Sequence, residues 1–210
     1  MRVAITQRVD AIKNYNETRD GLDQRWVELL NCINIEVVVI PNQLKNAKDY
    51  YQKLSLNGLI LTGGNDLELL GTKNNVSTAR DSVERELFSI AQELNHPILG
   101  VCRGMQYLCA LLGENLVKID GHVREKHMIY VDKSFKLFPN KIIVNSFHEW
   151  APVSLKSRSV LEVIARSKDG VIECVKHKSK RIYGMMWHPE RVTPFSSNDL
   201  KFIKHVFKLD

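Results

Sequence analysis

The clearest candidate for chemistry in this sequence is Cys102, which stands between Gly100 and Gly104. The apolar run 97–101 predicts a buried strand, and apolar residues at helical spacing over 105–112 predict a helix directly after it. Glycines two positions to either side suit a nucleophile on a sharp strand-to-helix turn. A thiol at a helix N-terminus is shifted toward the nucleophilic thiolate. The pattern predicts a cysteine nucleophile, and a buried structural cysteine is the alternative.

A second candidate is His188, in the segment W-H-P-E at 187–190, which follows another apolar stretch. Pro189 favours an extended backbone at His188, and residues two apart in an extended chain point the same way. Glu190 can then orient the imidazole while its other nitrogen faces a thiol. We therefore expect Cys102, His188 and Glu190 to form a catalytic triad.

Two adjacent glycines, Gly63 and Gly64, follow the predicted strand 58–62. Ligands bind at the carboxyl ends of parallel strands in open α/β sheets, and glycines allow a close approach to the backbone. We expect the backbone N–H groups of Gly64 and Arg103 to form an oxyanion hole beside Cys102. A plain turn is the alternative.

Three further histidines are weaker candidates. His148, in V-N-S-F-H at 144–148, lacks the spaced carboxylate that follows His188, and we interpret it as a wall of the substrate site or as structural. His122 and His127 have a spacing that suits a metal only with further ligands, and none is evident in the sequence. We expect no metal site.

The elements before Cys102 alternate between strand and helix, which predicts βαβ units and a parallel sheet. Strands are expected at 3–6, 35–40, 58–62 and 97–101. A polar loop is predicted over 7–16, and Thr18 or Asp20 is expected to cap a helix that continues through Leu30. A long amphipathic helix is predicted over 77–94. Arg80, Asp81 and Glu84 fall near its start, where carboxylates complement the helix dipole, and we interpret these residues as capping the helix.

The second half of the chain is richer in strands. Short runs with alternating polarity predict partly antiparallel pairing at 116–119, 128–131, 141–144, 160–165, 170–175 and 182–187. Apolar residues at helical spacing predict a closing helix over 200–207.

Length and composition favour one α/β domain over residues 1–210, with 44% hydrophobic and 26% charged residues. No apolar run is long enough to span a bilayer, and the N-terminus is predicted to be a strand rather than a signal peptide. The four cysteines are widely spaced without a zinc pattern, which favours a reducing cytoplasm. The net charge of +6 is spread along the chain, as on a solvated surface, so we expect neither a nucleic-acid nor a membrane partner.

The chain resembles the class I, or triad, glutamine amidotransferases. The motifs G-V-C-R-G-M-Q at 100–106, L-T-G-G-N-D at 61–66 and W-H-P-E at 187–190 have that family's order and spacing. Within it the chain is similar to free-standing γ-glutamyl hydrolases of the peptidase C26 type, through E-T-R-D-G-L-D at 17–23, R-D-S-V-E at 80–84 and V-N-S-F-H. The resemblance implies an α/β fold that is flavodoxin-like and three-layered. Its central sheet would have about seven strands and be mostly parallel, with extra antiparallel strands.

The resemblance also implies a role for each motif residue. Cys102 would attack the γ-carbonyl of a glutamyl amide, and His188, oriented by Glu190, would protonate the leaving nitrogen and then activate water. Gly64 and Arg103 would hold the oxyanion, and a glutamyl thioester would be the intermediate. The reaction would need no cofactor and no metal.

The residues implied to bind the substrate are Gly63, Gln106 and the backbone around Ser146, Phe147 and His148, which would hold the glutamyl α-amino and α-carboxylate groups. The chain is similar to small bacterial hydrolases of capsule phosphoramidate synthesis, which implies a CDP-linked glutamine cleaved to glutamate and cytidine diphosphoramidate. Four arginines are candidates to meet the pyrophosphate, namely Arg8, Arg19, Arg80 and Arg124.

Other functions stay open at this point. The enzyme could hydrolyse γ-glutamyl-γ-aminobutyrate or γ-glutamyl-polyamines, or serve as a glutaminase subunit that delivers ammonia to a synthase partner. A non-catalytic binding protein on the same fold is the alternative from another class. A homodimer is compatible with all of these functions.

Overall fold

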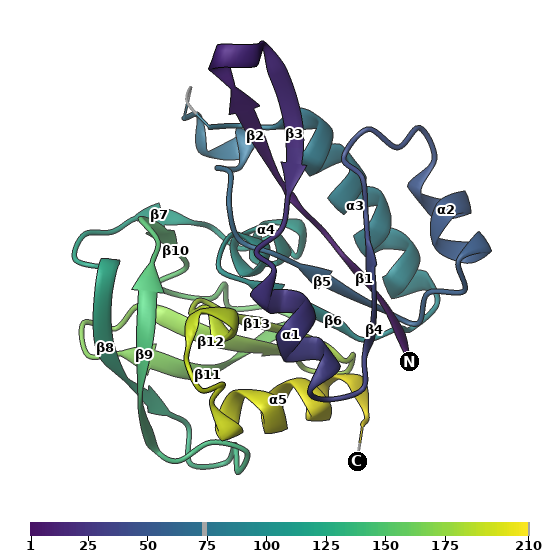
Figure 1. Ribbon diagram of the computed structural model, residues 1–210. Coiled ribbons are helices and arrows are strands. Elements are labelled where there is room, and N and C mark those ends of the chain that lie inside the picture. The colour runs from purple at the N-terminus through teal and green to yellow at the C-terminus, as the bar shows by residue number, and fades with distance from the viewer. Residues whose placement is uncertain (73–74, 210) are drawn as a thin grey trace.

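One sheet organises the molecule in the computed structural model, which describes residues 1–72 and 75–209 (Figure 1). Within these residues the sheet has nine strands in the order β4-β1-β5-β6-β13-β12-β11-β8-β9. The first five of these are parallel: β4 (Glu36–Val39), β1 (Arg2–Ile5), β5 (Gly58–Leu61), β6 (Ile98–Val101) and β13 (Ile182–Met185). The others continue the sheet antiparallel: β12 (Ile172–His177), β11 (Leu161–Ser167), β8 (Val123–Val131) and β9 (Lys141–Phe147). The predicted α/β class and mixed sheet are confirmed, but the expectation of about seven strands is too low because the antiparallel extension is longer.

Helices cover both faces of the parallel half, as predicted (Figure 1). On one face lie α1 (Arg25–Asn31) and α5 (Ser197–Phe207). On the other lie α2 (Ala47–Lys53), α3 (Thr78–Glu93) and α4 (Arg103–Leu111). Each face of the sheet packs against its helices in a separate hydrophobic core, and successive side chains of a strand point into alternate cores. In β5, Ile60 packs into the core beside α1 and α5, and Leu59 and Leu61 pack into the core beside the other three helices. This alternation explains why the parallel strands are continuous apolar runs.

The predicted polar loop over 7–16 is wrong. Residues Arg8–Ile12 form β2 and pair antiparallel with β3 (Glu17–Gly21), in a hairpin that projects from the sheet (Figure 1). A short 3-10 helix, Lys13–Tyr15, and Asn16 at φ 49° make the turn. The hairpin buries little of either strand, so it lacks the apolar alternation by which a strand is recognised in a sequence.

The predicted helix cap at Thr18 or Asp20 is also wrong, because both residues lie in β3 and α1 begins at Arg25. Asp20 instead accepts hydrogen bonds from the backbone and the side-chain amide of Asn42, at 3.0 and 2.8 Å. The hairpin is thereby attached to the loop after β4.

The remaining elements are short. The helix α2 was not predicted, and its N-terminus is capped by Asn46, whose side chain accepts a hydrogen bond from the Asp49 backbone at 2.8 Å. A separate two-stranded sheet joins β7 (Val117–Lys118) and β10 (Trp150–Ala151), and 3-10 helices occur at Glu68–Leu70 and Pro189–Arg191. The other predicted helices and strands are present within a few residues of their expected bounds.

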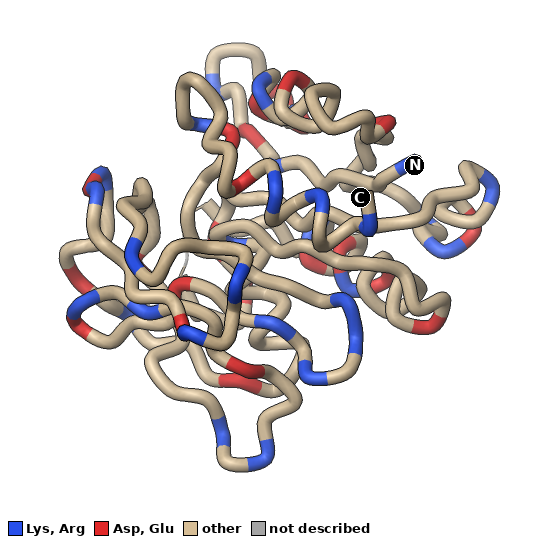
Figure 2. Tube along the Cα trace, turned by 90° about the horizontal axis from the view of Figure 1, so that it is seen from below, with Lys and Arg blue, Asp and Glu red and all other residues tan. Residues whose placement is uncertain are grey.

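Two features of the surface bear on the partner predictions. Lysines and arginines are scattered around the molecule with acidic residues among them (Figure 2). In the described part of the chain, no helix has both the length and the apolar character needed to cross a membrane.

Candidate active site

The Cys102 turn has the geometry that its sequence predicts. Cys102 lies between β6 and α4 with φ 53° and ψ −111°, a conformation that is strained for a residue with a side chain. A Cβ atom on Gly104 would lie 1.9 Å from the carbonyl oxygen of Leu61, and one on Gly100 would lie 2.6 Å from the carbonyl oxygen of Gly104. Both positions therefore require glycine, which allows the helix to start directly against the neighbouring strand.

His188 and Glu190 lie at the end of the adjacent strand β13. The His188 Nδ1 atom is 2.7 Å from Glu190 Oε1, and both side chains are 3% exposed. A Cβ atom on Gly63 would lie 3.6 Å from His188 Nε2 and 3.5 Å from Cys102 Cβ. The structure thus brings the thiol-bearing residue and the imidazole together over Gly63, with the carboxylate behind the ring.

The electrostatics of His188 favour its protonated form. Burial alone would lower the pKa of His188, but the Cys102 thiol and the Glu190 carboxylate outweigh burial and raise this pKa to about 9. An imidazolium beside a cysteine stabilises the thiolate. The pair is therefore suited to nucleophilic attack near neutral pH.

Asn145 is a positioning residue to which the sequence analysis gave no role. Its Oδ1 accepts a hydrogen bond from the His188 backbone N–H at 2.8 Å, and its Nδ2 donates one to the His188 carbonyl at 2.8 Å. An asparagine near the end of β9 is the sequence signal, since its side-chain amide can pair with both the N–H and the carbonyl of one residue.

Gly64 and Arg103, the residues expected to form an oxyanion hole, both lie near Cys102. Gly64, at φ 121°, follows β5, and a Cβ there would lie 2.5 Å from Arg8 Cβ. Arg103 is the first residue of α4, so its backbone N–H is one of the groups that a helix leaves unpaired at its N-terminus. These two backbone amides flank Cys102 from neighbouring elements.

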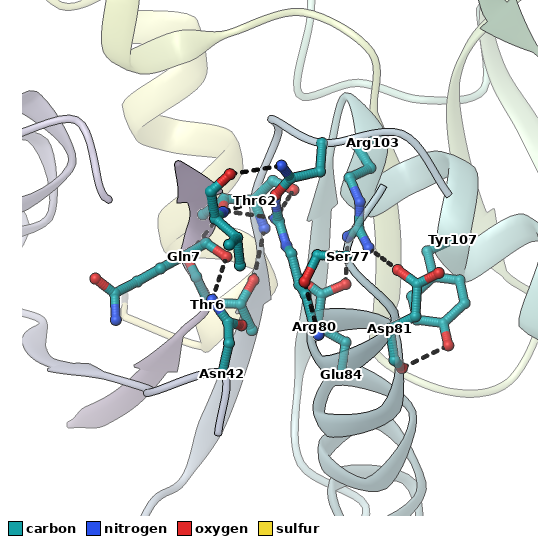
Figure 3. A network of polar contacts seen from close by, with 12 residues as sticks. Thr6, Gln7, Asn42, Thr62, Ser77, Arg80, Asp81, Glu84, Arg103 and Tyr107 are labelled. Atoms are coloured by element: carbon teal, nitrogen blue, oxygen red, sulfur yellow. Dashed lines mark hydrogen bonds and ion pairs between the residues drawn. The ribbon is translucent and has the colours of Figure 1, made fainter. Parts of the chain in front are cut away.

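A buried ion network lies behind the Gly63–Gly64 segment and supports it (Figure 3). The Arg103 guanidinium pairs with Asp81 and Glu84, and Arg80 Nε is 2.9 Å from Glu84 Oε1. Arg80 Nη2 also donates to the carbonyl oxygen of Thr62 at 2.8 Å. Burial and the nearby Arg103 lower the pKa of Arg80 to about 10, against the effect of Glu84.

The network corrects the sequence-based interpretation of these helix residues. Arg80, Asp81 and Glu84 are buried and join α3 to α4 and to the Gly63–Gly64 segment, rather than serving an exposed helix end. The helix cap is Ser77, whose hydroxyl accepts a hydrogen bond from the Arg80 backbone at 3.3 Å. Arg80 is wholly engaged in the interior and does not face the cleft.

The residues expected to bind the glutamyl group separate into two groups. Phe147 lines the cleft and packs edge-on against His188, with ring centroids 5.7 Å apart. The Ser146 hydroxyl instead donates to the carbonyl of His122 at 2.7 Å, and the buried His148 ring faces Glu173. The Gln106 amide donates to the carbonyl of Trp150 at 2.8 Å.

Of the arginines considered for binding a pyrophosphate, only some lie at the cleft. Arg8 and Arg124 line the cleft at Cys102, whereas Arg19 is exposed and pairs with Glu17 in the hairpin. Arg191, which the sequence analysis did not consider, lines the same cleft with its guanidinium 4.6 Å from the centre of the Phe147 ring. Three arginines therefore surround the opening above the nucleophile.

Comparison with known proteins is consistent with this geometry. The chain superposes on a glutamine amidotransferase from Thermotoga maritima with a TM-score of 0.69 at 15% identity, covering 99% of this chain and 84% of that one. The fold is thus that of the class I glutamine amidotransferases. Residues 3–190 match Peptidase C26, and the chain belongs to this family. It is a hydrolase that acts on an amide bond.

Two relatives show the range of activities within this similarity. The chain is 33% identical to gamma-glutamyl-CDP-amidate hydrolase of Campylobacter jejuni over 210 residues, covering 100% of this chain and 98% of the relative. It is 29% identical to a glutamine-hydrolysing GMP synthase subunit of Methanocaldococcus jannaschii over 164 residues, covering 77% of this chain and 78% of that relative.

Proposed function

We propose that this protein hydrolyses the γ-glutamyl amide bond of a CDP-linked glutamine, releasing glutamate and cytidine diphosphoramidate. The observation that carries the proposal is the approach of Cys102 and His188 over Gly63, beneath a cleft lined by arginines. The full-length similarity to gamma-glutamyl-CDP-amidate hydrolase supports the choice of substrate. Residues 1–210 act as a single catalytic domain in this proposal.

In the first half of the reaction, the Cys102 thiolate attacks the γ-carbonyl carbon. The carbonyl electrons move to oxygen, and the oxyanion is held by the backbone N–H groups of Gly64 and Arg103. As the tetrahedral intermediate collapses, the C–N bond breaks and His188 Nε2 gives its proton to the leaving nitrogen. The products of this step are the free phosphoramidate and a glutamyl thioester on Cys102.

In the second half, water attacks the thioester carbon and passes a proton to His188. The C–S bond then breaks, which restores the thiolate and the imidazolium and releases glutamate. Glu190 accepts the hydrogen bond from His188 Nδ1 throughout, so that Nε2 keeps facing the reacting atoms.

The arginines of the cleft favour a leaving group that carries phosphates, such as a nucleotide. The cleft encloses about 500 Å³, and Arg8, Arg124 and Arg191 line it. Guanidinium groups bind phosphate oxygens through paired hydrogen bonds. Arg8 forms an ion pair with Asp10, with Nε 3.0 Å from Oδ2, and Arg191 Nε is 3.6 Å from Glu190 Oε1. Arg124 forms no ion pair with any residue that the structure describes. Arg124 is therefore the arginine best placed to meet a pyrophosphate.

The test compares γ-glutamyl amides that differ only in the leaving group: cytidine diphosphoramidate, putrescine and γ-aminobutyrate. We expect kcat/KM for the CDP-linked substrate to exceed the others by about 10²-fold or more, because only this leaving group uses the arginines. Arg124→Gln should remove about tenfold of that preference, corresponding to one charge-assisted contact. The matched control is Arg19→Gln, which alters an exposed arginine outside the cleft. Equal or better turnover of γ-glutamyl-putrescine would contradict the substrate.

A glutaminase component of a larger synthase is the second candidate, favoured by the similarity to the GMP synthase subunit of Methanocaldococcus jannaschii. Such a component would hydrolyse glutamine well only when its synthase partner is bound. Strong turnover of a γ-glutamyl amide by the purified chain alone would exclude this function. Activity that emerges only after a synthase is added would support it.

A further inference from the structure

Three histidines and one glutamate meet behind the wall of the cleft. His122 Nδ1, His127 Nε2 and His148 Nε2 lie 3.2, 3.3 and 3.6 Å from the same atom, Glu173 Oε1. The side chains of His122, His148 and Glu173 are at most 3% exposed, and that of His127 is 19% exposed. His122 directly precedes β8 and His127 lies within it. His148 directly follows β9, and Glu173 lies in β12.

The facing atoms in this cluster have no hydrogen-bond partner among the residues that the structure describes. This holds for His122 Nδ1, His127 Nε2, both ring nitrogens of His148 and both carboxylate oxygens of Glu173. Buried polar atoms in folded proteins are almost always paired. Three histidine nitrogens approach one carboxylate oxygen without the geometry of a hydrogen bond, which indicates a group that they share.

The spacing of these atoms matches the edges of a metal coordination sphere. Zinc binds histidine nitrogen and carboxylate oxygen at about 2.0–2.2 Å in tetrahedral sites, so neighbouring ligand atoms are about 3.3–3.5 Å apart. The three nitrogen–oxygen distances, which are the three edges that meet at Glu173 Oε1, are 3.2 to 3.6 Å and fall around that range. The ligand atoms of His122, His148 and Glu173 all lie within 4.8 Å of one another. His127 lies beside this group, with its Nε2 3.3 Å from Glu173 Oε1 and its ring 4.7 Å from that of His122, and it has to turn toward the other two imidazoles to join them on one ion.

A second carboxylate orients one of the ligands. The far nitrogen of the His122 ring, Nε2, is 3.0 Å from Asp169 Oδ2, and the Ser167 hydroxyl donates to Asp169 in turn. A histidine that gives its outer N–H to a carboxylate presents a lone pair on its inner nitrogen, as metal ligands commonly do. Here the inner nitrogen is Nδ1, the atom that faces Glu173.

We propose that His122, His127, His148 and Glu173 form a four-coordinate site for a divalent transition metal, with zinc the best match. Three imidazoles and one carboxylate suit zinc or cobalt and disfavour magnesium and calcium, which prefer oxygen ligands. Four protein ligands fill a tetrahedral sphere, so the ion has a structural role. The sequence-based expectation of no metal rested on His122 and His127 alone, because the sequence does not show that His148 and Glu173 lie beside them.

The site would hold the wall of the cleft from behind. The His148 backbone N–H and the Ser146 hydroxyl both donate to the carbonyl of His122, at 3.0 and 2.7 Å. Phe147, between them, faces the opposite way and packs on His188. An ion that ties His148 to His122 would therefore fix the segment that carries Phe147. The metal inference stands independently of the proposed substrate.

Protons are the alternative occupants of the cluster. The histidines, against the opposing effect of burial, hold the pKa of Glu173 well below its usual range. The neighbouring Glu173 carboxylate raises the pKa of His122, as does Asp169, while burial opposes them. A cluster held together by protons alone would bind no metal ion tightly. Metal titration therefore distinguishes the two cases.

The test uses the full chain with Cys102→Ala, since Cys102, His188 and Glu190 could themselves bind zinc. The protein is stripped with a chelator and titrated with Co²⁺. We expect one equivalent to bind with the visible absorption of tetrahedral cobalt and without a thiolate charge-transfer band. Zinc, titrated against a chromophoric chelator, should displace the cobalt with a dissociation constant below about 1 µM and raise the Tm.

Variants of single ligands complete the test. His127→Gln, at the partly exposed ligand, and Asp169→Asn, at the outer carboxylate, should each weaken zinc binding by about 10- to 100-fold. The matched control is His96→Gln, a histidine outside the cluster, which should bind zinc as the parent does. Folding of each variant is checked by circular dichroism. The proposal is overturned if the stripped, folded parent gives no tetrahedral cobalt spectrum, or if His127→Gln binds zinc as tightly as His96→Gln.

Discussion

Asn145 holds His188 by both ends of a single side-chain amide. The Asn145 oxygen accepts a hydrogen bond from the His188 N–H, and the Asn145 nitrogen donates one to the His188 carbonyl, each at 2.8 Å. Asn145 belongs to the antiparallel extension, while His188 follows a strand of the parallel half. The base of the proposed triad is thus fixed by a strand outside the βαβ core that carries Cys102.

Removing this amide should slow the chemistry more than it weakens substrate binding. For Asn145→Ala we expect kcat to fall by about 10- to 100-fold with KM within about twofold, because a shifted imidazole no longer meets the thiol and the leaving nitrogen. Two buried backbone groups also lose their partners, which should lower the free energy of unfolding by about 1–3 kcal/mol each. Steady-state kinetics and urea unfolding measure the two effects. Asn140→Ala, exposed just before β9, is the control, and equal kcat values for the two variants would contradict the role.

The pKa of His188 predicts an alkaline limit to activity. Attack needs the thiolate with a protonated imidazole beside it, so kcat/KM should fall as the pH rises through about 9. Glu190→Gln removes one of the charges that raise this pKa, and the alkaline limb should move to lower pH. A pH profile of kcat/KM for both proteins measures the shift. A limb that does not move in Glu190→Gln would show that the carboxylate does not act on His188.

The same pKa has a consequence for stability. The pKa of His188 is raised in the folded protein from about 6.5, the value of an unperturbed histidine. Its contribution to the free energy of unfolding is therefore fully present below about pH 6.5 and is lost as the pH rises through about 9. Urea unfolding of the parent should become easier over this interval, and His188→Asn should reduce that dependence. An equally steep decline in His188→Asn would assign the loss to other groups.

The parallel half of the fold and the three motif segments could be predicted from the sequence because each depends on local rules. Continuous apolar runs mark strands buried on both faces, and Gly100 and Gly104 are required by contacts that any side chain at those positions would violate. The β2–β3 hairpin gave no such signal, since its strands are largely exposed. Asn145, Arg191 and Glu173 could not be found in this way, because their roles depend on which distant residues the fold places beside them.

The nucleophile and base are tested by substitutions that keep a polar side chain at each position. Cys102→Ser and His188→Asn should each reduce kcat by about 10³-fold or more, since a serine in this position lacks a thiolate and an asparagine cannot carry the proton. Both should keep the parent's circular dichroism spectrum. Mass spectrometry of the quenched reaction should show a glutamyl adduct on the parent and none on Cys102→Ser. An adduct at any residue other than Cys102 would refute the assignment.

The buried ion network predicts that two glutamates of one helix contribute very differently to the free energy of unfolding. Glu84, fully buried in α3, faces both Arg80 and Arg103, whereas Glu93 is exposed near the end of that helix and pairs with Lys48 at 3.0 Å. Glu84→Gln leaves two buried guanidinium groups with one carboxylate fewer and should cost about 3–5 kcal/mol of unfolding free energy. Glu93→Gln removes a solvated ion pair and should cost less than about 1 kcal/mol. Urea denaturation of both variants measures the difference, and equal midpoints would mean that the network does not stabilise the loop around Gly64.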